Sequence, residues 1–185
     1  MNPRESGRLR TAVGLILLST LFSSLCAPVW AQRRHDPLNP LEIDQLRDAM
    51  LDPDVRLKLY VKFSRDRMTT LEQMRSDPKA KNRPLQTHDM IEDFLAVYDE
   101  LNDNIDMYVG RKNDIRKPLK AVIEADTEFQ SKLRAIKDSA NTSPAELSQY
   151  EFVLTDALDT VDSSADDHRK TLTDVEAYMK HKKNK

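Results

Sequence analysis

The sequence predicts an all-α fold, an elongated antiparallel bundle of three to five helices that contains a long coiled-coil-like hairpin. Three observations lead to this prediction. Only one glycine, Gly110, follows position 31, whereas hairpin turns and phosphate-binding loops commonly depend on glycine. Most prolines stand at the ends of apolar segments, where helices start or stop. Within those segments, apolar residues recur every three or four positions, which is the helical period.

The first 31 residues are typical of a secretory signal peptide. Three arginines between positions 4 and 10 precede an apolar stretch over 11–25. Val29-Trp30-Ala31 then places small residues at the two positions that a signal peptidase inspects, which predicts cleavage before Gln32. An uncleaved membrane anchor is the alternative. Both interpretations place the remaining chain outside the cytoplasm, in the periplasm or the extracellular space, after export by the general secretory route.

The chain after position 31 has the composition of one soluble domain. It contains no cysteine, so disulfides cannot stabilise it, and it carries 26 basic against 30 acidic residues. This mildly acidic balance argues against nucleic acid as a partner and against stable membrane insertion after cleavage. We predict an extended lead over 32–39, a single helical-bundle domain over 40–182 and a basic tail over 183–185.

Proline and capping residues predict the first two helices. The first begins at Pro40 after the cap Asn39 and reaches about Leu51, and the second follows Asp52 from Pro53 to about Ser76. A basic loop bounded by prolines covers 77–84. The residues expected in the core are Leu41, Ile43, Leu46 and Met50 of the first helix, and Leu59, Tyr60, Phe63, Leu71 and Met74 of the second.

A heptad-like seam runs from Ile91 to Ile136 without a change of phase. Two independent helices have no evident reason to share one phase across their junction. We therefore favour one long helix over about 86–139, bent at Pro118, over a hairpin near Gly110. The seam includes two charged residues, Lys112 and Asp126.

The last predicted helix begins with the capping box formed by Ser143 and Glu146, continues to about His181 and carries one irregularity near Leu154. The short connection before it predicts antiparallel packing, in which the numbers of facing residues sum to about 283. Two clusters of opposite charge would then neutralise each other, although a calcium or phosphate site is an alternative. These clusters are Arg116, Lys117 and Lys120 on one helix and Asp162, Asp166 and Asp167 on the other.

No catalytic motif is present, and we predict a non-enzymatic protein without a cofactor. The chain lacks the Glu-x-x-His pairs of di-iron bundles and the paired histidines of helix-borne zinc sites. Two groups remain as candidate metal ligands. His88 and Glu92 lie one helical turn apart beside Asp89, where the alternative role is helix capping. His168 follows Asp166 on the last seam, where it could instead fix helix register or respond to pH.

The leading functional prediction is an exported interaction module of the cell envelope, which binds another envelope protein, unfolded chains or a second copy of itself. Its basis is an apolar stripe expected to stay open where only two helices pack, formed by Phe129, Leu133, Phe152 and Val153. A small metal-binding bundle is the alternative, and an acid/base enzyme using Asp126 is a third class. The overall pattern is similar to that of small helical envelope proteins of bacteria in general, a likeness that assigns no residue a role.

Overall fold

The computed structural model describes residues 36–139 and 142–184, and these contain helices and no strand. The all-α bundle predicted from the sequence is therefore confirmed. The predicted signal segment 1–31, the first half of the predicted lead 32–39 and the final residue of the predicted tail lie outside the described residues.

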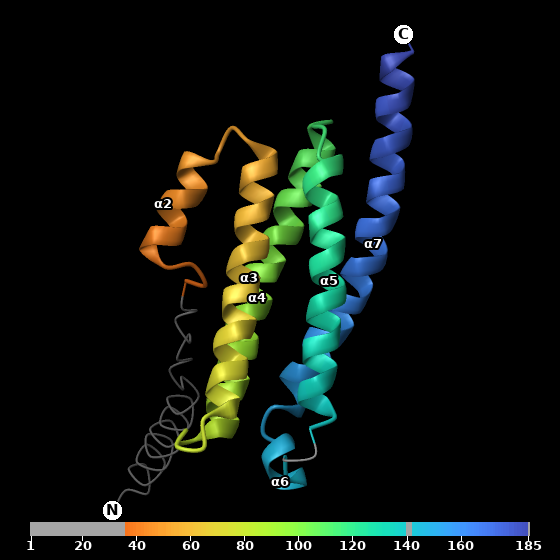
Figure 1. Cartoon of the computed structure of the whole chain (residues 1–185). Coiled ribbons are helices and arrows are strands. Elements are labelled where there is room, and N and C mark those ends of the chain that lie inside the picture. Colours follow the sequence, from red (N-terminus) through yellow and green to blue (C-terminus); the bar gives the residue numbers. More distant parts are fainter. Residues whose placement is uncertain (1–35, 140–141, 185) are drawn as a thin grey trace, which may run out of the picture. The chain divides into compact units, whose positions relative to one another are not determined.

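Four long helices and two short ones form the described part of the chain (Figure 1). The long helices are α3 (Pro53–Ser76), α4 (Arg83–Gly110), α5 (Arg116–Lys137) and α7 (Glu151–Lys183). The short helices are α2 (Pro40–Asp48), which packs against α3, and α6 (Pro144–Leu147), which lies in the connection between α5 and α7. No helix in the described ranges has both the length and the apolar character that crossing a membrane requires.

The four long helices form a bundle in which α3 and α7 each pack against both α4 and α5. This places α4 diagonally opposite α5, and the two meet through aromatic side chains in the centre, where the Phe94 and Phe129 rings lie 5.1 Å apart. Ion pairs between α3 and α5 advance in the same direction along both helices, from Asp54–Lys117 to Glu72–Lys132. The pairs α3–α4 and α5–α7 are antiparallel, whereas α3 and α5 are parallel.

The start of α2 and the whole of α3 agree with the sequence prediction. Asn39 and Glu42 form a complete capping box at the start of α2, and the side chain of Asp52 accepts two backbone N–H bonds at the start of α3. The predicted core face of α2 is correct only in part. Leu46 is buried and Ile43 half-buried, but Leu41 and Met50 are 67% and 61% exposed, because the main packing partner of α2 is the single helix α3.

The single kinked helix expected over 86–139 is wrong, because the chain turns back on itself after Gly110. The turn is a Schellman motif: the N–H of Asn113 bonds to the carbonyl of Tyr108, and the N–H of Lys112 to that of Val109. Lys112 supplies the left-handed residue, with φ of 59°. Pro118 lies in the first turn of α5, where its missing N–H removes no helical bond.

The antiparallel packing of α5 and α7 is confirmed, but the predicted register is wrong by about a dozen residues. Lys120 pairs with Glu176, and Arg134 with Asp162. The shift arises because α6 and a turn at Ser148–Tyr150 lengthen the connection before α7 begins. Ser143 accepts the N–H of Glu146 as predicted, but the Glu146 carboxylate binds Arg83 instead of completing the capping box.

The ion pairs predicted between the two charge clusters do not form. Arg116 binds Asp114, and Lys117 binds Asp54. On α7, Asp166 binds Arg169 of its own helix. The members of each cluster that form ion pairs thus bind other neighbours, which follows from the shifted register of α7 against α5.

Candidate functional sites

The apolar stripe predicted as an interaction surface is closed. Phe129 and Leu133 are fully buried and Val153 is 5% exposed, because four helices pack side by side where the sequence predicted two. Phe152 alone faces solvent, with 87% of its surface exposed. An isolated exposed apolar side chain is common on protein surfaces, so Phe152 does not by itself make a binding surface.

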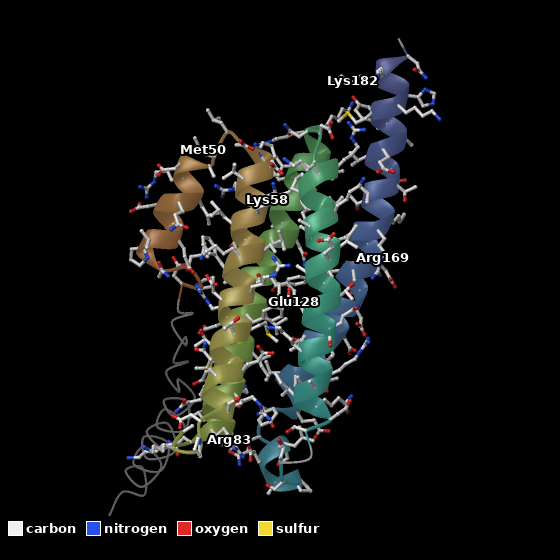
Figure 2. All side chains as sticks on the ribbon, viewed as in Figure 1. Met50, Lys58, Arg83, Glu128, Arg169 and Lys182 are labelled. Atoms are coloured by element: carbon white, nitrogen blue, oxygen red, sulfur yellow. The ribbon has the colours of Figure 1, made fainter. Side chains whose placement is uncertain are left out.

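Among the described residues, three exposed apolar side chains lie close together in the chain where α2 joins α3. Leu51 is 91% exposed, Met50 61% and Val55 45%, and we call these three residues the α2–α3 corner. Figure 2 shows Met50 at the end of α2, beside the turn into α3. A groove of about 370 Å³ between the two helices adjoins this corner, and Ala49, Val55 and Leu59 supply its apolar lining. The sequence indicated these residues as apolar but assigned Met50 to the core.

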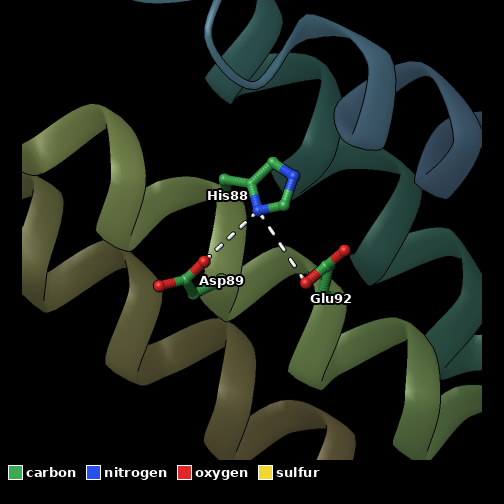
Figure 3. A group of neighbouring side chains, drawn as sticks. All are labelled: His88, Asp89 and Glu92. Carbon is green, nitrogen blue, oxygen red and sulfur yellow. Dashed lines mark hydrogen bonds and ion pairs between the residues drawn. The ribbon is translucent and has the colours of Figure 1, made fainter. Parts of the chain in front are cut away.

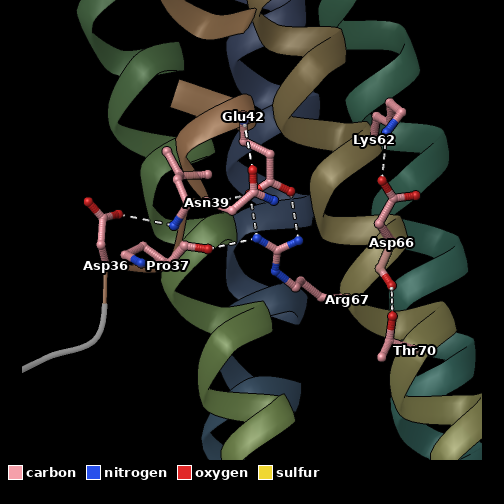
Figure 4. Close-up of polar contacts among 9 residues, drawn as sticks. Asp36, Pro37, Asn39, Glu42, Lys62, Asp66, Arg67 and Thr70 are labelled. Atoms are coloured by element: carbon pink, nitrogen blue, oxygen red, sulfur yellow. Dashed lines mark hydrogen bonds and ion pairs between the residues drawn. The ribbon is translucent and has the colours of Figure 1, made fainter. Parts of the chain in front are cut away.

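One buried ion pair holds α2 beside the bundle (Figure 4). Both guanidinium NH groups of Arg67 donate to the Glu42 carboxylate, at 2.8 and 2.6 Å, and one also donates to the carbonyl of Pro37. Burial raises the pKa of Glu42, but the bonds from Arg67 and from the N–H of Asn39 outweigh this effect and hold the pKa below its ordinary value. This pair positions the α2–α3 corner.

The structure brings together the first group of predicted metal ligands, His88, Asp89 and Glu92 (Figure 3). His88 Nδ1 lies 3.3 Å from an Asp89 oxygen and 3.8 Å from a Glu92 oxygen. One ligand atom from each of the three residues lies within 4.8 Å of the others, so one divalent cation could contact all three. Both carboxylates are well exposed.

The capping role considered for this group is wrong, because α4 begins at Arg83 and His88 lies beyond the first turn. Thr87, which directly precedes the group, is fully buried and accepts a bond from Arg75. The group therefore lies on an exposed helical face, where it needs neither to cap the helix nor to support the core.

The second predicted group does not form a metal site. His168 is 4% exposed and bonds to Asp126, whereas Asp166 is exposed and bonds to Arg169. In the centre of the bundle, His168 Nδ1 and the Tyr98 hydroxyl donate to the two oxygens of the Asp126 carboxylate, at 2.9 and 2.8 Å. Burial and the neighbouring carboxylate both raise the pKa of Tyr98, so its hydroxyl remains a donor.

This Tyr98–Asp126–His168 network links α4, α5 and α7 at one level of the bundle. Both oxygens of the fully buried carboxylate already have protein donors. A buried carboxylate satisfied in this way specifies which helices face one another and in what register. The role of His168 and Asp126 in helix register, inferred from their seam positions, is consistent with this arrangement.

No protein-family model, no curated protein and no solved structure matches this chain.

Proposed function

We propose that this protein is an exported, non-enzymatic interaction module of the cell envelope, and that it binds a partner protein through the α2–α3 corner. The observation that carries the proposal is the exposure of three neighbouring apolar side chains, Met50, Leu51 and Val55, beside a groove. Exposing apolar side chains together costs free energy in water, and contiguous patches of this kind mark binding surfaces.

The arrangement of α2 supports this surface. The helix is anchored at Glu42, near its start, while the corner lies just after its end. A partner side chain entering the groove would meet the apolar side chains of Ala49, Val55 and Leu59, flanked by the polar Gln45, Asp48 and Asp52, and leave the four-helix core undisturbed. Burying an apolar side chain there contributes about 1.5–3 kcal/mol, which suits an anchor residue in a protein interface.

Site-specific photocrosslinking in the native host tests the corner directly. A photoreactive amino acid replaces Leu51 in one variant and Phe152 in a matched control, since both side chains are almost fully exposed. We expect one discrete protein adduct from position 51, lost when Met50 and Val55 are also changed to glutamate, and none from position 152. No adduct at position 51, or the same adduct from both positions, would contradict the proposed surface.

Export is tested in the same cells by the intact mass of the protein in the envelope fraction. The signal-like segment that supports export predicts a chain that starts at Gln32. Recovery of the full-length protein in the cytoplasm, with no processed form in the envelope, would contradict this part of the proposal.

A metal-binding role is the second candidate function, and the convergence of His88, Asp89 and Glu92 supports it. Titration with Zn²⁺ in a buffer free of chelators should then give one site per chain, lost in His88→Ala. Asp93→Ala is the matched control, because this neighbouring carboxylate is not part of the group. Equal Zn²⁺ affinity in the parent protein and in His88→Ala would rule out the site.

A further inference from the structure

A cleft of about 490 Å³ opens at the end of the bundle where α3 finishes, between α3, α5 and the connection that follows α5. Its charged lining consists of Arg75, Arg83, Lys132 and a single acid, Glu72. Arg83 lies at the opposite end of the bundle from Met50 (Figure 2). The part of α3 from Val55 to Arg75, roughly 30 Å long, separates this cleft from the α2–α3 corner.

Arg75 is the distinctive residue of the cleft, because all of its hydrogen-bond acceptors among the described residues are uncharged. Its guanidinium donates to the hydroxyls of Thr87, Tyr150 and Thr142 at 3.2, 3.1 and 3.0 Å. It also lies 5.4 Å from the centre of the Tyr150 ring. Thr87 and Tyr150 are buried, so they hold the half-buried guanidinium in a fixed position.

The acids nearby are already engaged. Both oxygens of Glu146 accept bonds from Arg83, at 2.8 Å each, and Glu72 binds Lys132 at 2.9 Å. Glu146 is close enough to Arg75 for the arginine to lower its pKa further, after the larger effect of Arg83. Nevertheless, no carboxylate of the described residues bonds to Arg75, whereas Arg67 forms a bidentate pair with Glu42.

The hydroxyl groups around Arg75 add hydrogen-bond donors to the cleft. Thr142 accepts a bond from Arg75, which leaves its own hydroxyl proton available to another acceptor. Thr142 and Ser139 both line the cleft, as does Lys132. A fixed guanidinium, an ammonium group and hydroxyl donors are the groups that bind the oxygens of a small anion.

We propose that this cleft binds an oxyanion, the carboxylate or phosphate group of a small ligand, with Arg75 as its principal donor. Arg75 binds the anion through guanidinium donor capacity that the three hydroxyls leave unused. Lys132 supplies a second positive charge from α5, and Thr142 a hydroxyl donor from the following connection. This site is separate from the α2–α3 corner and does not depend on the function proposed for it.

The test is a titration followed by nuclear magnetic resonance, with inorganic phosphate in one series and succinate in another. Sodium chloride keeps the ionic strength constant, because a non-specific charge effect would follow ionic strength alone. We expect saturable shifts at Ser76, Ser139, Thr142 and the Arg75 side chain. Stronger binding of phosphate identifies a phosphoryl ligand, and stronger binding of succinate identifies a carboxylate ligand; either result supports the site.

Two variants and one control make the test specific. Arg75→Gln keeps a donor toward the hydroxyls but removes the charge, and it should weaken anion binding at least about tenfold. Lys132→Gln, which removes partly buried ion pairs with Glu72 and Glu128, should weaken it about threefold and guards against a folding defect in the first variant. Arg65→Gln is the control, because Arg65 bridges α3 and α5 through Glu128 but does not line the cleft. Shifts that chloride reproduces, or equal affinity in all four proteins, would overturn the proposal.

Discussion

The centre of the bundle and its α2 flank are built on opposite principles. In the centre, the two oxygens of Asp126 are bonded by Tyr98 and His168 from two other helices, and the Tyr98 ring packs against the rings of His168 and Phe129. At the flank, α2 buries one large apolar side chain, Leu46, and depends on the Glu42–Arg67 pair. Many contacts hold the centre together, and they are partly redundant. Few contacts hold α2, so the loss of one is enough to release the helix.

This difference indicates where function can reside without loss of the fold. Opening of the centre would expose the aromatic core and an unpaired carboxylate, so it requires global unfolding. Opening of α2 would break the Glu42–Arg67 ion pair and the bond from Arg56 to the carbonyl of Leu46, and leave α3, α4, α5 and α7 packed. A binding surface on α2 can therefore adjust to a partner while the four-helix bundle remains a rigid support.

The largest expected effect comes from breaking the central network. Asp126→Leu should lower the free energy of unfolding by about 3–5 kcal/mol, because it leaves the Tyr98 hydroxyl and His168 Nδ1 buried without an acceptor. Urea denaturation followed by circular dichroism measures this loss. The triple variant Tyr98→Phe, Asp126→Leu, His168→Leu removes the orphaned donors and should recover most of it. A loss below 1 kcal/mol in the single variant would show that the centre does not depend on this network.

A smaller and more local effect is expected from breaking the α2 anchor. Glu42→Gln should lower the free energy of opening of α2 by about 2–3 kcal/mol, because the bonds to Arg67 lose their charge. The stability of the rest of the bundle should not change. Amide resonances of residues 40–48 should shift, while those of α4 and α5 stay unchanged. Loss of the whole folded spectrum would instead show that α2 and the bundle unfold as one unit.

The same anchor predicts a dependence on pH. The pKa of Glu42 is lower in the folded protein than its ordinary value of 4.5. The stabilisation from the pair is therefore complete above about pH 4.5 and disappears as the pH falls through the depressed pKa of the folded state. The α2 amide resonances should report release of α2 below pH 4.5 in the parent protein, and Arg67→Met should abolish that transition. A transition that persists in Arg67→Met would have another cause.

The turn between α4 and α5 offers a stabilising change. Gly110 is helical, and no atom lies within 4 Å of an added Cβ, while Lys112 occupies the left-handed position that glycine prefers. Gly110→Ala and Lys112→Gly should each raise the free energy of unfolding by about 0.5–1 kcal/mol. Urea midpoints of the single and double variants measure this. Destabilisation by Lys112→Gly would contradict the described turn.

The smallest effect on stability is expected at the corner itself. Leu51→Lys should change the free energy of unfolding by less than about 0.5 kcal/mol, because the side chain is 91% exposed. The same change should abolish the crosslinked adduct from a probe at Val55. A stability loss above 1 kcal/mol in urea would mean that Leu51 packs against the protein and is not available to a partner.

Local signals in the sequence predicted most helix boundaries, but not how the helices pair. Asn39 and Asp52 identified two helix starts because capping depends on residues that are adjacent in the chain. The turn after Gly110 escaped prediction because Ile115, in the loop, is buried and continues the apolar phase across the break. The irregularity near Leu154 was the one local sign of the break before α7, whose start at Glu151 sets the register.

The candidate sites show the same division between features set by local sequence and features set by the pairing of helices. The convergence of His88, Asp89 and Glu92 was predictable, since it depends on spacing within one helix. The partnership of His168 with Asp126 and Tyr98, and the cleft around Arg75, depend on three or more helices meeting at one level. The α2–α3 corner was missed because apolar spacing indicates a buried face but does not show whether another helix is present to cover it.

Native-state hydrogen exchange tests the central contrast most directly. We predict that amides of α2 open with a free energy at least about 1.4 kcal/mol below that of the core amides of α4 and α5, which is a tenfold difference in the opening equilibrium. Glu42→Gln should widen this gap without changing the core values. Equal opening free energies for α2 and the core, in both the parent and the variant, would contradict the account of a rigid bundle with a separately held binding flank.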